Sequence, residues 1–234
     1  MNIRGIILVI VIIIVLYFLF SYFTRKTTQL SSFKSAKESK IVKANQLPLN
    51  TTSHNYTHSI WFNVNDWKYR LSTPKVLLQR GTPNSNPKIT LAAYENNINI
   101  QVSTHPVSQT SNSNESTDFD CIIRNFPLQK WVNLIVSLNG RTLDAYLDGK
   151  LVRTCVLPGV PNTNADSDVS ITPDGGFSGS TTNLVYLTHA VNPQEAYNIY
   201  KKGPGGGGVG SLFEKYKIKV SYLVNNTEKG SITT

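Results

Sequence analysis

The chain has 234 residues, 40% of them hydrophobic, a length that suits one β-sandwich or two small domains. Its formal net charge is +9, yet residues 53–203 carry 12 basic and 11 acidic side chains, so the excess positive charge lies in the flanks and a nucleic-acid partner is not expected. The two cysteines are too few for a zinc cluster, an iron–sulfur site or a disulfide-stapled miniprotein.

An apolar segment opens the chain. From Ile6 to Phe23 every residue except Ser21 is apolar or aromatic, and no charge occurs between Arg4 and Arg25. A helix of about 20 residues crosses the hydrocarbon core of a bilayer, and the run is longer than the core of a signal peptide and lacks a small-x-small cleavage site. We therefore expect residues 1–26 to be an uncleaved single-pass anchor. Its apolar positions include Ile6, Ile10, Ile14, Phe18 and Phe23.

Basic residues follow the anchor far more often than they precede it. The positive-inside rule therefore predicts that the rest of the chain lies on the cytoplasmic side of the membrane. Sequons at Asn50, Asn55, Asn114 and Asn225 would matter only in the reverse orientation.

Residues 27–52 have few large apolar residues and no sustained period, which predicts a basic, flexible linker. Its lysines and the end of the anchor could contact anionic lipid headgroups, or the segment could be a solvated stalk. The membrane-surface candidates are Arg25, Lys26, Lys34 and Lys37.

Residues 53–203 read as an all-β domain, because short runs with period-two alternation recur between turn signals. We expect an antiparallel jelly-roll sandwich. The predicted strands are Ser59–Val64, Lys75–Arg80, Lys88–Tyr94, Ile98–Ser103, Phe119–Ile123, Trp131–Leu138, Thr142–Leu147, Leu151–Val156, Val169–Ile171 and Asn183–Leu187.

Local signals fix two features of this domain. Asn139-Gly140 and Asp148-Gly149 favour type I′ turns, so residues 131–156 should form a three-stranded meander. Asn192 followed by Pro193 predicts the start of a helix that ends at Gly203.

The stretch WVNLIVSLNGRTLDAYLDGKLVRT, with Ser59–Phe62 before it and TNLVYLTHAVNPQEAYNIYKKGP after it, resembles the laminin-G-like or concanavalin A-like jelly roll. In that family a Trp-led strand, an Asn-Gly turn, a Y-x-D-G-K hairpin and a late short helix occur in this order. The resemblance covers residues 55–203 and implies the fold, but little about function.

Catalytic patterns are missing from the sequence. Glycosidases of the laminarinase type present two carboxylates as E-x-D-x-x-E, and none of the six glutamates has an acid two residues later. The four histidines are scattered and form no triad or helical metal motif. We expect no enzymatic activity and no cofactor.

Calcium is the one ion with candidates, since the resemblance implies loop sites of acids and carbonyls. The turn-rich loop at 162–176 holds Asp166, Asp168 and Asp174, although Asp is also a common turn residue. Trp67 and Tyr69 could stack on a sugar or belong to the rim of the core.

Residues 204–234 combine a glycine-rich hinge with an alternating strand, which predicts a β arm. The arm could fold onto its own sandwich or add to the sheet of a neighbour. Its partner-binding candidates are Phe213, Tyr216, Ile218, Val220 and Tyr222.

Cys121 lies before the meander and Cys155 lies at its end, and the two form a possible disulfide. Sequence alone does not show whether their Cα atoms come within about 7 Å, and a cytoplasmic location favours free, buried thiols.

A short anchor, a cytoplasm-facing laminin-G-like domain and the IYKKGP ending resemble proteins of large icosahedral DNA viruses of algae and protists. That resemblance implies a minor capsid protein in the virion, on the inner membrane beneath the shell, that contacts the lipid membrane and the major and other minor capsid proteins. The alternative function is a membrane-tethered lectin or adhesion module that binds glycans, with the sandwich facing outward.

Overall fold

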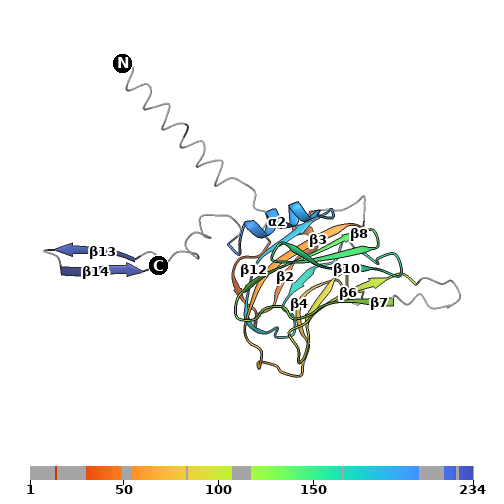
Figure 1. Ribbon diagram of the computed structural model, residues 1–234, viewed down its shortest axis with the longest axis horizontal. Coiled ribbons are helices and arrows are strands. Elements are labelled where there is room, and N and C mark those ends of the chain that lie inside the picture. Colours follow the sequence, from red (N-terminus) through yellow and green to blue (C-terminus); the bar gives the residue numbers. More distant parts are fainter. Residues whose placement is uncertain are drawn as a thin grey trace, which may run out of the picture.

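The computed structural model describes residues 30–48, 54–82, 84–106, 117–164, 166–205, 219–224 and 227–233, together with Ile14. Two antiparallel six-stranded sheets face each other (Figure 1) and confirm the predicted all-β sandwich. In spatial order, sheet A consists of β1 (Lys34–Ser35), β12 (Ser178–Leu187), β3 (Tyr56–Asp66), β8 (Trp131–Asn139), β9 (Thr142–Leu147) and β10 (Lys150–Val156). Sheet B consists of β2 (Lys40–Val42), β11 (Val169–Ile171), β4 (Lys75–Arg80), β5 (Lys88–Leu91), β6 (Ile98–Thr104) and β7 (Thr117–Ile123).

The predicted meander over residues 131–156 is present as β8, β9 and β10. Its second turn, Asp148–Gly149, has positive φ at both residues, 49° and 74°, as a type I′ turn requires. The first turn differs from the prediction. Asn139 pairs with Thr142, so the two-residue loop begins at Gly140, and only that first loop residue has positive φ, the pattern of a type II′ turn.

The main core fills the space between the sheets. Phe62 of β3 packs edge-to-face on Phe126 and Phe177, with ring centroids 5.5 and 6.4 Å apart, and all three side chains are fully buried. Along β8, Leu134 and Val136 point into this core while Ile135 points to the opposite face, where a second apolar cluster lies. Burying each such side chain stabilises the fold by roughly 1.5–3 kcal/mol.

The helix α2 (Pro193–Lys201) covers part of the outer face of sheet A (Figure 1). As predicted, Asn192 caps it: the side chain accepts a hydrogen bond from the backbone N–H of Glu195, and Pro193 occupies the first turn. Tyr200 stacks on Trp61 of β3, with centroids 5.5 Å apart. The second apolar cluster joins the helix to the sheet through Ile135, Tyr146, Val191, Ala196 and Ile199.

Residues 30–48 differ from the predicted flexible linker. β1 pairs with β12 and β2 pairs with β11, so this segment adds one edge strand to each sheet, and the 3-10 helix η1 (Ala44–Gln46) follows. Ala36, Val42 and Leu47 are buried in the main core. Strands of two and three residues are too short to show a hydrophobic period. They form by pairing with strands far along the chain.

The C-terminal arm forms a hairpin of its own. β13 (Lys219–Val224) pairs with β14 (Thr227–Thr233) and, among the described residues, with no strand of either large sheet (Figure 1). Of the predicted arm residues, Val220 and Tyr222 lie in β13. The other three, Phe213, Tyr216 and Ile218, lie outside the described residues.

The predicted membrane anchor lies outside the described residues except for Ile14, which is helical and 48% exposed. Within the described ranges, no helix combines the length and the hydropathy that a membrane span requires.

Candidate functional site

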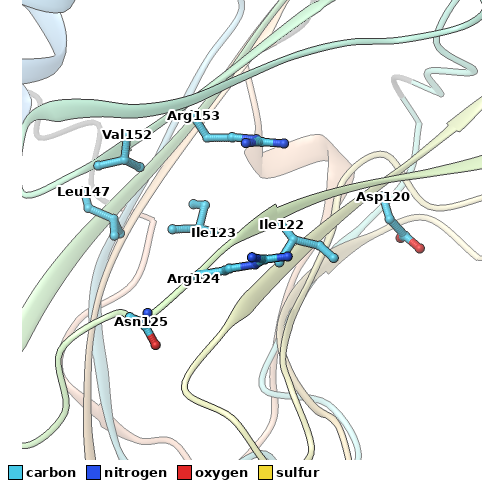
Figure 2. Close-up of a pocket in the computed structure, with 8 residues that line it drawn as sticks. All are labelled: Asp120, Ile122, Ile123, Arg124, Asn125, Leu147, Val152 and Arg153. Atoms are coloured by element: carbon cyan, nitrogen blue, oxygen red, sulfur yellow. The ribbon is translucent and has the colours of Figure 1, made fainter.

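A cavity of about 590 Å³ opens where the edge strand β7 of sheet B meets the edge strand β10 of sheet A. Figure 2 shows the eight side chains around it, drawn from β7, from the segment after it, from the end of β9 and from β10. The lining residues are Asp120, Ile122, Ile123, Arg124, Asn125, Leu147, Val152 and Arg153.

A disulfide bond between Cys121 of β7 and Cys155 of β10 holds the two walls together. The Cα atoms are 6.1 Å apart, within the range that a disulfide spans. The expectation of free thiols therefore differs from the structure: strands 34 residues apart in sequence lie side by side at the open edge of the sandwich.

A β-bulge aims Arg153 at the cavity. The pairing of β10 with β9 slips by one residue between Leu151 and Arg153, so that Arg153 lies opposite Ala145. Since directly opposed residues share a face, Arg153 points to the same inner face as the buried Ala145. Bulges commonly re-aim side chains beside functional sites.

Arg124 is positioned by the loop between β5 and β6. The next residue, Asn125, has a φ of 56°, and its backbone N–H donates to the side chain of Asn97 at 3.0 Å. Phe126 then donates its N–H to the carbonyl of Asn96 at 2.9 Å and is fully buried in the core. Arg124 thus stands on a segment that hydrogen bonds and core packing hold in place.

The two arginines dominate the charge of the cavity. Among the described residues, neither Arg124 nor Arg153 forms an ion pair or a hydrogen bond, and both side chains are exposed. In Figure 2 their guanidinium groups extend in the same direction. Asp120 is the one carboxylate in the lining, and it accepts a hydrogen bond from the side chain of Asn99 at 2.9 Å.

The outer face of sheet B continues from the cavity as a polar surface. The register places Gln79, Lys88, Gln101 and Asp120 directly opposite one another across four strands, so these side chains share a face. Asp120 therefore belongs both to this row and to the cavity rim.

Of the three aspartates proposed for calcium, Asp168 has side-chain contacts within the fold. Asp168 accepts hydrogen bonds from the Lys43 ammonium and the Ala44 N–H, both at 2.8 Å, and these contacts hold its pKa below the ordinary value. Asp174 takes a φ of 57° in a turn, while the backbone N–H of Asp166 donates to Asn164. No group of three or more potential metal ligands occurs in the part of the chain that the structure describes.

The other predicted surface residues also have local contacts. Lys34 lies in β1 and donates to the carbonyl of Ser39 at 3.1 Å, and the Lys37 ammonium lies 4.6 Å from the ring centre of Tyr69. Trp67 packs against the main core, so it is not a free sugar-stacking ring. Arg25 and Lys26 lie outside the described residues.

Sequence reasoning missed the two cavity arginines, although one signal could have found them. Arg124 follows Cys121 by three residues and Arg153 precedes Cys155 by two. If the cysteines are assumed to be bonded, the two arginines are expected at the same edge of the sandwich. The bulge that turns Arg153 inward has no sequence signature.

Comparison with known proteins assigns the chain to a family. A laminin-G-type family profile, described as the concanavalin A-like lectin/glucanases superfamily, matches residues 37–196. The chain belongs to this superfamily. The sequence matches no curated protein.

Solved structures with the same sandwich include binding domains of botulinum neurotoxins. The serotype D binding domain is 13% identical with a TM-score of 0.54 over 70% of this chain, and the mosaic serotype C/D receptor binding domain is 13% identical with a TM-score of 0.55 over 72%. The DC binding domain in complex with rat synaptotagmin II is 15% identical with a TM-score of 0.51 over 70%. This chain spans 40–41% of the length of these proteins, so the likeness concerns the concanavalin A-like fold.

The cavity presents guanidinium and amide donors, one carboxylate acceptor and apolar surface at one concave site. A two-carboxylate glycosidase site needs a second acid across the scissile bond, and the described lining offers only Asp120.

Proposed function

We propose that this protein is a membrane-tethered, non-catalytic carbohydrate-recognition protein. The observation that carries the proposal is an open, mixed polar and apolar cavity on a sandwich of the concanavalin A-like lectin/glucanase superfamily. Asn125 and Asp120 supply the amide and carboxylate groups that saccharide hydroxyls bind, and Ile122 and Val152 supply apolar surface for the C–H faces of a sugar ring.

The tether rests on the sequence of residues 6–23, an apolar run of bilayer-spanning length. The absence of catalysis rests on the carboxylates, since Asp120 has no acidic partner among the described lining residues.

The proposal also includes an outward orientation of the sandwich. The Cys121–Cys155 disulfide supports it, because disulfides persist in oxidising compartments and are rare in the cytosol. Four sequons in the same chain are consistent with a lumenal or extracellular location. This orientation is the reverse of the one that the basic residues after the anchor favour.

A glycan array probed with the full chain in lipid nanodiscs tests this function. We expect binding to a restricted set of glycans, unchanged by a chelator, and no release of reducing sugar from any bound glycan. An array without binding contradicts carbohydrate recognition, and measurable hydrolysis contradicts the non-catalytic role. Loss of binding with chelator would point instead to a calcium site.

A second candidate is a minor capsid protein that links a viral shell to the membrane beneath it, and the C-terminal hairpin favours it. The β13–β14 pair is separate from both large sheets, and an isolated two-stranded hairpin is marginally stable in water. A partner sheet would stabilise it by strand addition. Cross-linking mass spectrometry on intact particles, following Lys219 and Lys229, should then give links to an abundant shell protein. Links confined to the chain itself would count against this role.

A further inference from the structure

We propose that the β7–β10 cavity binds an anionic saccharide, whose acidic group, a carboxylate or a sulfate, is held between Arg124 and Arg153. This inference rests on the proposed carbohydrate recognition and names the ligand class for the same cavity.

The first step concerns charge. Arg153 lies in β10 of sheet A and Arg124 directly follows β7 of sheet B, and within the described residues no carboxylate pairs with either of them. Two like charges at one site repel each other. An anion between the two groups removes this repulsion and gains charge-assisted hydrogen bonds.

The second step concerns geometry. A guanidinium group is a planar fork of donors that matches the two oxygens of a carboxylate or the oxygens of a sulfate. Figure 2 shows both side chains extending in the same direction. Because both arginines line the cavity, an acidic group inside it meets a guanidinium donor on each wall.

The third step concerns preorganisation. The bulge in β10 fixes the inward direction of Arg153, and the hydrogen bonds of Asn125 and Phe126 to the β5–β6 loop fix the segment of Arg124. The disulfide sets the spacing between the two walls. Because little order remains to be imposed on the backbone when a ligand binds, the entropic cost of binding is reduced.

The fourth step assigns the rest of the ligand. Asp120, held by Asn99, and the Asn125 amide can bind hydroxyl groups, while Ile122 and Val152, each 45% exposed, offer apolar contact. A free inorganic anion would leave these groups unused. The negative charge of Asp120 also disfavours a ligand that carries acidic groups along its whole length, so a saccharide with one acidic group fits best.

The test measures the affinity of the full chain, in nanodiscs, for matched oligosaccharides that are neutral, carboxylated or sulfated on one sugar. Arg124→Gln and Arg153→Gln should each weaken binding of the acidic form at least tenfold. Lys150→Gln, which removes the same charge from the same strand outside the cavity lining, should change it less than twofold. Arg153→Lys should lose most of the affinity, because a lysine keeps the charge but not the fork. The carboxylated and sulfated arms identify which acidic group is used.

Equal binding of neutral and acidic forms, unaffected by the arginine variants, would overturn this inference and leave carbohydrate recognition standing. Equal losses in Lys150→Gln and the arginine variants would overturn it as well, because they indicate non-specific attraction. No binding of any saccharide would overturn both this inference and the proposed function.

Discussion

The buried side chain of His58 makes the stability of the fold depend on pH. It lies on β3 between the rings of Tyr56 and Tyr186, at centroid distances of 5.3 and 4.9 Å, and neither ring nitrogen has a hydrogen-bond partner among the described residues. The Arg80 guanidinium lies over the ring of Tyr186, 4.6 Å from its centre. Burial, followed by the charge of Arg80, lowers the pKa of His58 well below 6.5, so the folded protein holds it neutral.

We predict that the free energy of unfolding falls as the pH drops below 6.5. Below that pH His58 is protonated in the unfolded chain but neutral in the folded chain. This difference lowers the free energy of unfolding by up to about 1.4 kcal/mol per pH unit, until the pH reaches the pKa of His58 in the folded chain. Denaturant titrations between pH 7.5 and 5 should show this slope in the wild type and a shallower slope in His58→Gln. The exposed His54→Gln variant is the control and should keep the wild-type slope. Equal slopes in all three proteins would contradict the assignment.

At the scale of elements, the edge strands β7 and β10 set both the stability and the shape of the cavity. They belong to different sheets, and the described residues show no backbone ladder between them. The Cys121–Cys155 bond is therefore the covalent link that holds the cavity walls at a fixed spacing.

We predict that the Cys121→Ala/Cys155→Ala double variant is less stable than the wild type by about 3–4 kcal/mol, the chain-entropy value for a closed loop of 34 residues. Its affinity for the acidic saccharide should also fall, because β7 and β10 can separate. Denaturant titrations and binding measurements with and without a phosphine reductant check this. Reductant should weaken the wild type and leave the double variant unchanged, and a wild type indifferent to reductant would contradict the role of the bond.

The predictability of these elements follows the range of the interactions that form them. The Asp148–Gly149 turn and the Asn192 cap depend on neighbouring residues, so the sequence predicted the β8–β10 meander and the start of α2. β1 and β2 are too short to show a period and form by pairing with distant strands. The cavity depends on a bulge and a disulfide between distant strands, so Arg124 and Arg153 could not be placed together from local patterns.

The whole molecule presents two opposing topology signals. Basic residues cluster after the apolar N-terminal run, which favours a cytoplasmic sandwich. The disulfide and the sequons favour the other side of the membrane. In the proposed function the second set prevails, because the recognition cavity must face the glycans of another surface.

We predict that in sealed microsomes the sandwich resists added protease and that detergent abolishes this protection. Deglycosylation should lower the apparent mass if any of the four sequons is used. Cleavage of the sandwich in intact microsomes would show that it faces the cytoplasm and would favour the capsid-linking candidate. A variant that lacks residues 6–23 gives the unprotected control.

Hydrogen–deuterium exchange of the full chain, with and without the acidic saccharide, tests the central claim most directly. Exchange reports the backbone segments that a ligand protects, so binding in the cavity should slow exchange in residues 120–125 and 147–153 and leave the outer face of sheet B around Lys88 unchanged. Protection at β4–β6 with none at β7 and β10, or no protection anywhere at saturating saccharide, would contradict the account.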